Sequence, residues 1–385
     1  MNPSQSELDV VVVGAGFSGM YLLHKLRQLG LSARVLEAGA DVGGTWYWNR
    51  YPGARCDVPS MEYSFSFSSE LQQEWRWTEV MAAQPEILDY ANHIAERFDL
   101  RSDIEFSTRV VSAHFLDADQ RWQIATDTGR RYEARFCVMA TGCLSVPNTP
   151  KIEGAEHFAG DIFHTGNWPA EGVDFSKRRV GIIGTGSSAI QAIPVIAEQA
   201  QHLTVFQRTP NYTMPAHNRP LTDEFRQNAI NNYDDIRQQQ RESMTGIVGY
   251  GFGFGGADNV EPTETILQTT EAQRAALVEE EGFVAIRRFA DIALDPEANE
   301  LACDMYRQQI ERVIKDPQTA QGLMPRDYPM GCKRPVIDTN YYETFNRDNV
   351  TLVDLRRGGI ETITANGVQT AQGHFEFDTL VYATG

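Results

Sequence analysis

Two short apolar runs, each followed at once by a glycine-rich turn and a helix-like stretch, dominate the pattern of hydrophobic and polar positions. The first run is DVVVV at residues 9–13, and the second is RRVGIIG at residues 178–184. A continuous apolar run of this length is typical of a strand buried on both faces of a parallel sheet. The stretches that follow the turns, residues 20–30 and 190–200, have the composition of helices. The pattern therefore predicts two strand–turn–helix units.

Further apolar runs extend both units. Residues 33–38 and 202–210 are predicted to form the next strand of each unit, and residues 86–98 are predicted to form a helix. Two other apolar strands end in the same Ala-Thr-Gly triplet, within residues 136–142 and 374–385. Glycine directly after a buried strand favours a tight turn. We therefore expect the chain to cross from one domain to the other at each triplet.

The stretch from residue 217 to residue 325 has a different character. Its long polar runs are rich in helix-favouring residues, so we expect a helical insertion within the second nucleotide domain. Inside the insertion, residues 246–259 are rich in glycine and phenylalanine. Glycine gives this stretch conformational freedom, and two interpretations remain open: a mobile loop over a site, or a flexible surface connection.

The predicted fold class is α/β, with two dinucleotide-binding, Rossmann-like domains. A chain of 385 residues exceeds the usual size of a single core. We assign residues 1–142 to the first domain and residues 143–377 to the second, and we expect residues from about 378 onward to return to the first. The sheet of the first domain would then be incomplete and would expose apolar strand edges, which indicates that its C-terminal part is missing.

Charge and composition narrow the function classes. Lys and Arg number 34 and Asp and Glu number 52, which gives a net charge of −18 and disfavours binding to nucleic acid or an anionic membrane. No apolar stretch approaches the ~20 residues of a membrane span, and the first residues lack the pattern of a secretory signal. The five cysteines include no C-x-x-C pair, so we expect free thiols in a cytoplasmic protein. Metal-ligand clusters and a G-x-S-x-G motif are not evident in the sequence.

The first glycine-rich turn, GAGFSG, carries a dinucleotide fingerprint. Gly14 permits the tight turn, Gly16 lets the backbone approach a pyrophosphate, and Gly19 lets the helix pack close to the strand. The helix N-terminus offers N–H groups to phosphates, and an acid about 20 residues on accepts from ribose hydroxyls. The predicted cofactor-binding residues of this unit are Gly14, Gly16, Phe17, Ser18, Gly19 and Glu37.

The second glycine-rich turn, GTGSSA, repeats the fingerprint, with Ala189 in place of the third glycine. Where NAD-binding proteins have an acid, this chain has Gln207, Arg208 and Thr209. A guanidinium there suits a 2′-phosphate and favours NADPH over NADH; the alternative is that Arg208 is an ordinary surface charge. The predicted binding residues are Gly184, Thr185, Gly186, Ser187, Ser188, Arg208 and Thr209.

An irregular loop rich in aromatic residues follows the first unit at residues 41–60. Its aromatic side chains either pack internally or form a wall around a flat ring system. Asp57 lies at the end of this loop among apolar neighbours. Asp57 is a candidate site residue, and the alternative is an acid that caps the loop or closes an Asx-turn.

Between the two fingerprints lies FAGDIFHTGNWP, which has the pattern F-x-G-x-x-x-H-T-x-x-W-P. Together with GGTWxxxxYPGxRCD, FQRTP, KRP and the two ATG triplets, it closely resembles the type I Baeyer–Villiger monooxygenases, a family of flavin-dependent enzymes. Related monooxygenases that oxidise amines or sulfides share the fingerprints but lack the W-P ending. The residues of this linker signature are Phe158, Gly160, His164, Trp168 and Pro169.

The resemblance implies a reaction. The first domain would bind FAD and the second NADPH, and a flavin C4a-peroxide formed with O2 would attack a small ketone to give an ester or lactone. Arg334, a cation that cannot lose its proton, would stabilise the peroxide and then the oxyanion of the adduct. Asp57 would orient Arg334 and offset the cost of its burial.

The resemblance also extends the list of binding residues. Lys333, with Arg208 and Thr209, would hold the 2′-phosphate of NADP. His164 and Trp168 would act as hinge or linker residues, although a purely structural, hydrogen-bonded His164 is an equal alternative. The flavin side of the site would include Gly44, Thr45, Trp46, Asp57 and Tyr63.

Three rival functions stay open at this stage. An NADPH-dependent disulfide reductase is disfavoured by the absent C-x-x-C. A flavin monooxygenase that acts on amines or sulfides shares the fingerprints, and a cofactor-binding remnant would hold nucleotide without catalysis. The identity of the ketone and the oligomeric state do not follow from the sequence.

Overall fold

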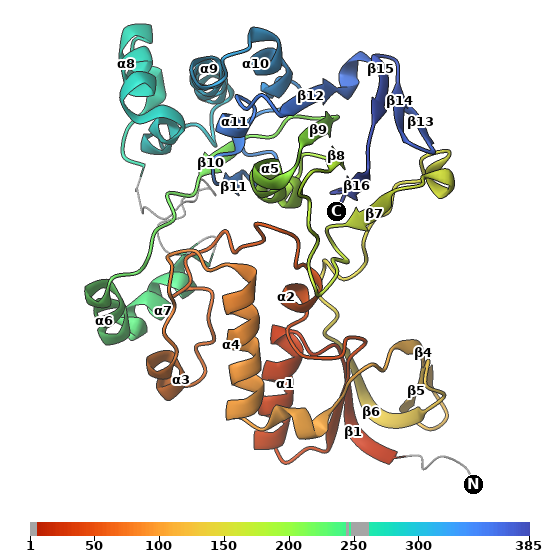
Figure 1. Ribbon diagram of the computed structural model, residues 1–385. Coiled ribbons are helices and arrows are strands. Elements are labelled where there is room, and N and C mark those ends of the chain that lie inside the picture. The colour runs from red at the N-terminus through yellow and green to blue at the C-terminus, as the bar shows by residue number, and fades with distance from the viewer. Residues whose placement is uncertain (1–5, 244–245, 248–261) are drawn as a thin grey trace. The chain divides into compact units, whose positions relative to one another are not determined.

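The computed structural model describes residues 6–243, 246–247 and 262–385, which form two compact units (Figure 1). The first unit holds the described residues up to Arg50 and Gln84–Pro147. The second holds Tyr51–Ala83 and the described part of Asn148–Gly385. The glycine- and phenylalanine-rich loop predicted at 246–259 lies outside the described residues, apart from 246–247.

The first unit is built on a six-stranded sheet in the order β3-β2-β1-β6-β5-β4, which is parallel from β3 to β6 and antiparallel beyond. Helix α1 packs on β1 and β2 through Met20, Leu23 and Leu26. The elements of this unit are β1 (Ser6–Val13), α1 (Phe17–Gln28), β2 (Ala33–Leu36), α2 (Thr45–Trp48), α4 (Gln84–Arg97), η1 (Leu100–Asp103), β3 (Ile104–Glu105), β4 (Val110–Leu116), β5 (Arg121–Thr126) and β6 (Arg131–Met139).

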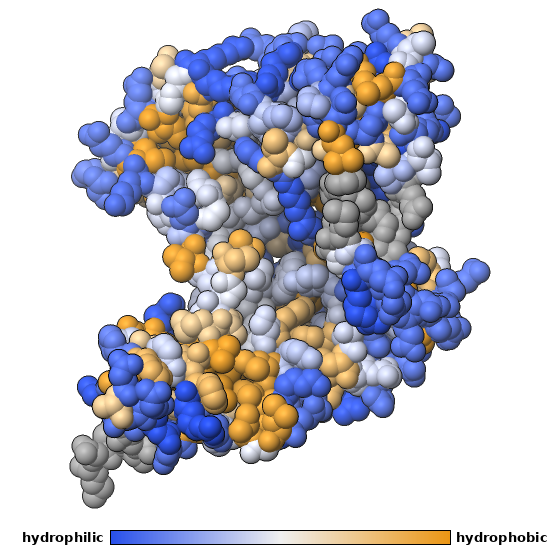
Figure 2. All heavy atoms as spheres, turned by 180° about the vertical axis from the view of Figure 1, so that it is seen from behind, coloured by the Kyte–Doolittle hydropathy of each residue, from blue (hydrophilic) through white to orange (hydrophobic). Residues whose placement is uncertain are grey.

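The second half of β6 has an open edge in this unit. β5 pairs with β6 only as far as Ala134, and the described residues supply no further strand beside Arg135–Met139. Phe136 is 53% exposed and Met139 is 62% exposed, and Figure 2 shows apolar side chains gathered on the surface of this unit. The second half of β6 therefore combines an edge that no described strand covers with exposed apolar side chains.

The second unit is built on a five-stranded parallel sheet in the order β12-β9-β8-β16-β7. Its core gathers Phe206, Val353, Val368, Phe377 and Leu380, all buried. The elements around it are η2 (Ala155–His157), β7 (Asp161–His164), β8 (Arg179–Ile183), α5 (Ser187–Gln199), β9 (His202–Gln207), β12 (Val350–Asp354), η6 (Leu355–Arg357), β16 (Thr379–Tyr382) and an antiparallel meander of β13 (Ile360–Thr364), β14 (Gly367–Thr370) and β15 (Gly373–Glu376).

A helical segment follows β9, as the composition of residues 217–325 predicts. Several of its helices begin at side-chain caps, for example at Asp295, whose carboxylate accepts from the backbone of Glu297 and Ala298. The elements are β10 (Thr213–Pro215), α6 (Asp223–Asn231), α7 (Tyr233–Glu242), η4 (Ile266–Gln268), α8 (Glu271–Glu281), η5 (Gly282–Arg288), α9 (Pro296–Val313), α10 (Pro317–Leu323), β11 (Val336–Asp338) and α11 (Tyr341–Thr344).

Two observed groupings differ from the expected domain boundaries. Residues 51–83, which include α3 (Ser69–Glu74), group with the second unit because Arg237 on α7 donates to Ser64 Oγ at 2.7 Å and to Gln72 Oε1 at 2.9 Å. Residues from 378 onward do not return to the first unit. β16 pairs with β7 and β8 in the middle of the second sheet, because the apolar run that precedes the second ATG is needed to complete that sheet.

None of the helices in the described part of the chain combines the length and the apolar character needed to cross a bilayer. All five cysteines are free thiols, as their spacing predicts. Over the same described residues, no three His, Cys, Asp or Glu side chains are grouped so that they could hold a metal ion.

Candidate functional site

The first glycine-rich turn joins β1 to α1 within the first unit. Gly14 has φ +106°, and a Cβ there would lie 2.6 Å from the carbonyl oxygen of Ala140. A Cβ on Gly19 would lie 1.9 Å from the carbonyl oxygen of Gly14, so the helix packs directly on the turn. Because the N-cap of α1 is Gly16, no side chain covers the first N–H groups of the helix. This arrangement suits a pyrophosphate.

Glu37 lies directly after β2 and is buried. Its carboxylate accepts hydrogen bonds from the backbone N–H groups of Ala15 and Gly39, both at 2.6 Å. The acid therefore braces the glycine-rich turn, a role that the sequence pattern did not indicate. Each carboxylate oxygen keeps a lone pair, so the predicted contact with a ribose remains compatible with these bonds.

The aromatic loop begins with a glycine pair that lies against the first turn. Gly43 N–H donates to Ala15 O at 3.1 Å, and a Cβ on Gly44 would lie 2.8 Å from Gly16 Cα. The positive φ of Gly44 and this close approach leave no room for a side chain at Gly44, and such an exposed backbone suits a nucleotide cofactor. Thr45 then begins α2, a one-turn helix where the sequence predicted only irregular chain.

Trp46 is buried, and its carbonyl oxygen accepts from Gln84 Nε2 at 2.5 Å. Its burial favours the packing interpretation for this residue. Phe17 packs edge-on against Tyr90, with ring centroids 6.2 Å apart, while Ser18 beside it is exposed. The first unit thus presents a rigid, glycine-lined turn supported by buried aromatic rings.

The second glycine-rich turn repeats this construction in the second unit. Gly184 has φ +119°, and a Cβ there would lie 2.3 Å from the carbonyl oxygen of Ala383, which belongs to the second ATG triplet. Thr185 is buried and donates to Thr209 O at 3.0 Å. Helix α5 begins after Gly186 at Ser187, and Ser188 Oγ lies 3.0 Å from Thr165 Oγ1.

The end of β9 combines a buried amide with an exposed cation. Gln207 is fully buried and donates to Gly322 O at 2.7 Å, so it points into the core. Arg208, the next residue, is exposed, and Thr209 is half-buried. The structure thus leaves the Arg208 guanidinium exposed directly after β9.

Lys333 lies close to the same loop, through a tyrosine that the sequence analysis did not single out. The Nζ atom of Lys333 is 4.4 Å from the ring centroid of Tyr328. The hydroxyl of Tyr328 donates to Pro210 O at 2.9 Å and lies 3.1 Å from Asn211 Oδ1. Lys333 thus packs on a tyrosine ring whose hydroxyl is hydrogen-bonded to the loop that follows Arg208.

Arg334 and Asp57 form an ion pair within the second unit. The Nη2 atom of Arg334 lies 3.1 Å from Oδ2 of Asp57. The two residues are far apart in the sequence, and they meet because Tyr51–Ala83 belongs to the second unit. Asp57 is therefore not only a loop-capping acid, since its carboxylate has a fixed cationic partner.

One part of the expectation about this pair is wrong. The side chain of Arg334 is 58% exposed and that of Asp57 is 33% exposed, so there is no burial of the guanidinium for the carboxylate to offset. The physical reason is that Lys333 and Arg334 lie on an exposed turn, while burial begins at the following proline. The pair orients the guanidinium at a surface that is open to a ligand.

Comparisons with known proteins bear on the family. Residues 11–270 match the family described as pyridine nucleotide-disulphide oxidoreductase. The chain is 43% identical over 386 residues to a Baeyer–Villiger monooxygenase from Pseudooceanicola batsensis, an alignment that covers 99% of this chain and 69% of the relative. This chain belongs to the Baeyer–Villiger monooxygenase family. The predicted family and the α/β fold with two nucleotide-binding domains are confirmed.

Two further comparisons define the range of the Baeyer–Villiger family around this chain. A phenazine N-monooxygenase from Lysobacter antibioticus is 40% identical over 389 residues, with 99% of this chain and 70% of the relative covered. The solved structure of OTEMO in complex with FAD and NADP is 38% identical, with a TM-score of 0.89 and coverage of 99% of this chain and 72% of that chain. The family thus includes proteins named for different chemistries on one fold.

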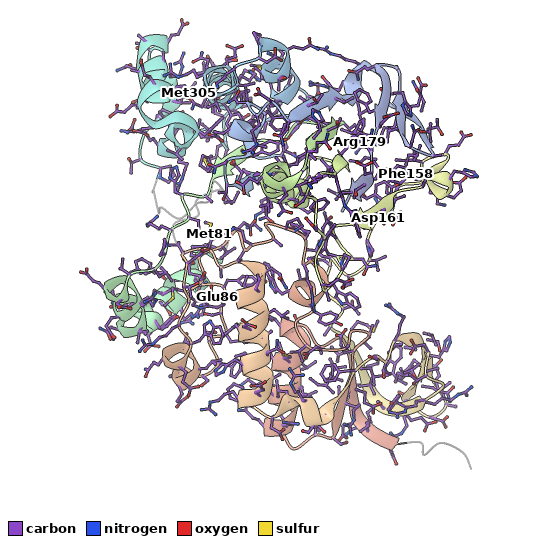
Figure 3. The ribbon with its side chains drawn as sticks, viewed as in Figure 1. Met81, Glu86, Phe158, Asp161, Arg179 and Met305 are labelled. Atoms are coloured by element: carbon purple, nitrogen blue, oxygen red, sulfur yellow. The ribbon has the colours of Figure 1, made fainter. Side chains whose placement is uncertain are left out.

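The linker signature of this Baeyer–Villiger family member is a structural element of the second unit. Phe158 and Asp161 lie at one end of the sheet, near Arg179 (Figure 3). A Cβ on Gly160 would lie 2.4 Å from Asp378 O, which explains the glycine. Trp168 is buried between Phe163 and Phe175, with centroid distances of 5.6 and 6.2 Å, and Pro169 follows it.

His164 contacts residues near both ends of the segment Asn148–Gly385 of the second unit. Its Nδ1 accepts from the Gly166 N–H at 2.9 Å, so the proton of the neutral ring is on Nε2, which faces Asn148 O at 3.4 Å and Thr384 Oγ1 at 3.3 Å. Burial lowers the pKa of His164. These contacts favour the structural interpretation of His164 over proton transfer.

Tyr63 was predicted, and it lies half-buried just beyond Asp57, with its N–H donating to Pro59 O at 2.9 Å.

Sequence reasoning missed three other residues of the second unit. Thr165, Gln191 and Tyr328 carry no motif that an isolated sequence would reveal. Only Thr165 had a signal, since it is the Thr of the His-Thr pair in the linker signature.

Proposed function

We propose that this chain uses NADPH and O2 to insert one oxygen atom beside the carbonyl of a small ketone, giving an ester or lactone. Ketone, O2, NADPH and a proton give ester, NADP⁺ and water, so each oxygen atom and both electrons of the hydride are accounted for. The observation that carries the proposal is the Arg334–Asp57 pair. The pair stands in the unit that also carries Arg208 and Lys333 beside the second glycine-rich turn.

The chain is a flavoprotein monooxygenase of a family whose solved member OTEMO holds FAD and NADP. Bound FAD would supply the redox chemistry: it would accept the hydride of NADPH, and its reduced form would react with O2. In this proposal the first unit holds FAD through its glycine-rich turn, the glycine pair that follows it, and Glu37. The residues of this unit assigned to FAD are Gly14, Gly16, Phe17, Ser18, Gly19, Glu37, Gly44, Thr45 and Trp46. Asp57 and Tyr63, which the sequence also assigned to the flavin side, belong to the second unit.

The second unit holds NADPH in this proposal. Backbone N–H groups at the start of α5 receive the pyrophosphate. Arg208 and Lys333 pair with the 2′-phosphate in this proposal. Arg208 is an exposed cation directly after β9, and Lys333 packs on Tyr328, whose hydroxyl is bonded to the loop that follows. The Tyr328 ring supports the ammonium of Lys333 from one side. The residues assigned to NADPH are Gly184, Thr185, Gly186, Ser187, Ser188, Arg208, Thr209 and Lys333.

Arg334 is the proposed electrostatic catalyst. A guanidinium keeps its charge at any working pH, so it can stabilise the negative charge that develops on the carbonyl oxygen of the ketone when oxygen adds. Asp57 holds the guanidinium in one orientation through the 3.1 Å contact. Because more than half of the Arg334 side chain is exposed, its charge is accessible to a substrate.

Product analysis tests the proposal. The FAD-loaded chain is incubated with NADPH, air and a panel of cyclic and linear ketones, and esters or lactones are expected. Loss of one oxyanion-hole donor lowers kcat by about 10²–10³, so Arg334→Ala should abolish most ester formation while NADPH still reduces the flavin. Ester yields that survive this substitution would show that Arg334 does not have the proposed role.

A second candidate, N-oxygenation, is favoured by one observation. The phenazine N-monooxygenase is nearly as similar to this chain as the Baeyer–Villiger relative is, so overall similarity does not separate N-oxygenation from ketone oxidation. The same panel is therefore extended with aromatic amines and thioethers. N-oxides or sulfoxides in the absence of any ester would favour this candidate over ketone oxidation.

A further inference from the structure

A short segment carries Asp57 across the surface of helix α5. This segment, Tyr51–Asp57, is called the arm here. Gly53 in the arm has φ +82°, and a Cβ there would lie 2.2 Å from Gln191 O and 3.1 Å from Val195 Cγ2. The arm therefore lies flush on the backbone of α5, and glycine is required at the point of closest approach.

One side chain of α5 holds the arm by its polar groups. Gln191 Nε2 donates to Arg55 O at 3.1 Å, and Gln191 Oε1 accepts from Tyr51 Oη at 2.8 Å and, over a longer 3.5 Å, from Arg55 N. The amide thus contacts both the backbone carbonyl and the backbone N–H of Arg55. Burial, followed by the charge of Asp57, raises the pKa of Tyr51, so the phenol remains a donor.

The opposite side of the arm is fixed independently. Arg55 Nη1 donates to Glu79 Oε2 and to Met81 O, both at 2.7 Å, and Asn218 Nδ2 donates to the same Glu79 oxygen at 2.8 Å. The Cys56 N–H donates to Ala82 O at 2.9 Å. These contacts position the guanidinium and the end of the arm. Among the residues that the structure describes, the Gln191 contacts alone connect the arm to α5 by hydrogen bonds.

Helix α5 also begins at the second glycine-rich turn. Gln191 lies four residues after Ser187, the first residue of the helix, so the two share one face of the helix a single turn apart. A ligand at the start of α5 and the arm therefore act on the same rigid turn of helix. Asp57, at the end of the arm, is in turn paired with Arg334.

We propose that Gln191 is a positioning residue that connects the nucleotide-binding end of α5 to the Asp57–Arg334 pair. This inference rests on the function proposed above. The amide of Gln191 holds the arm so that Asp57 keeps Arg334 in place while the nucleotide occupies the start of α5. Gln191 does not touch the reacting atoms in this scheme, and its effect passes through the backbone of Arg55.

The primary test measures the arm itself. Hydrogen–deuterium exchange of residues 51–57 is compared in the wild-type chain, in Gln191→Met, which keeps the length of the side chain without its amide, and in Gln199→Met. Gln199 is exposed on the same helix and serves as the matched control. The net loss of one hydrogen bond changes an equilibrium constant by about 2–10-fold. Exchange in the arm should therefore become faster by about that factor in Gln191→Met alone. Unchanged exchange would overturn the proposal.

The second readout separates positioning from binding and from general damage. In Gln191→Met the rate at which NADPH reduces the flavin should stay within about twofold of wild type. The fraction of NADPH that yields ester should fall by about 2–10-fold, with hydrogen peroxide formed instead. Tyr51→Phe, which removes one of the contacts, should give a smaller loss. Equal losses of reduction and oxygenation would overturn the positioning role.

Failure of this inference is distinguishable from failure of the proposed function. If the wild-type chain forms no ester from any ketone, the proposed function fails, while faster exchange of the arm in Gln191→Met still supports the contact. If the wild-type chain forms esters and Gln191→Met forms them with wild-type coupling, the proposed function stands and the role of Gln191 is refuted.

Discussion

Arg208 offers the sharpest test of how this chain selects its nucleotide. The residue is exposed at the end of β9, and over the described residues it takes part in no ion pair. Arg208→Ala therefore removes a free cation without breaking an internal contact. Surface substitutions of this kind change the free energy of unfolding by about 0.5 kcal/mol or less, so any effect on turnover reports nucleotide binding.

The magnitude follows from the chemistry of a phosphate contact. A hydrogen bond to a charged group contributes about 1.5–3 kcal/mol, which corresponds to about 10–150-fold in affinity. Lys333 remains beside the Tyr328 ring and keeps part of the interaction, so the lower half of that range is expected. NADH lacks the 2′-phosphate, and its affinity should change little.

The assay is anaerobic stopped-flow reduction of the bound flavin at a series of NADPH and NADH concentrations. Arg312→Ala, at another exposed arginine of the second unit, is the matched control and should leave both dissociation constants unchanged. Raising the ionic strength should reduce the difference between wild type and Arg208→Ala, because salt screens an exposed charge. Equal losses of affinity for NADPH and NADH would refute the 2′-phosphate assignment.

Two further predictions concern stability. Burial raises the pKa of Asp338 from 3.8 to about 6, so the stability that its neutral form contributes is present below about pH 4 and is lost as the pH rises through 6. Asp338→Asn should then raise the free energy of unfolding by roughly 1–3 kcal/mol above pH 6. Urea titrations of both proteins that gave the same difference at pH 4 and at pH 7.5 would contradict this. Trp168 packs between two phenylalanine rings, so Trp168→Ala should lower the free energy of unfolding by about 3–5 kcal/mol, with Trp168→Phe as the milder control; a loss of oxygenation at full stability would instead indicate a hinge role.

The fingerprints were predictable because each rests on local chemistry. Gly14 and Gly184 have positive φ angles and lie where a Cβ would meet a carbonyl oxygen, and glycine after an apolar run signals such a turn. The same local reasoning placed α1, α5 and the strands before them. It failed at β16, because an apolar run of four residues does not show which of two parallel sheets will take it.

The site was predictable only in part. The W-P ending and the KRP motif pointed to Arg334, and the motif order pointed to Asp57, yet nothing in the sequence shows that the arm lies on α5 or that Gln191 binds it. Hydrogen bonds between residues more than 100 positions apart leave no periodic pattern in the sequence. The exposure of Arg334 was also mispredicted, since burial of a charge depends on the fold around it and not on its neighbours in the chain.

The sequence by itself determined the two nucleotide-binding turns, the helical insertion between the strands of the second unit, and the family. These properties depend on backbone freedom, on the alternation of apolar and polar residues and on short motifs, all of which are local. Only the tertiary structure decided that Tyr51–Ala83 joins the second unit, that Asp57 meets Arg334 at 3.1 Å, and that Lys333 is attached to the loop after β9. Those pairings depend on which surfaces bury each other, and burial is a property of the whole folded chain.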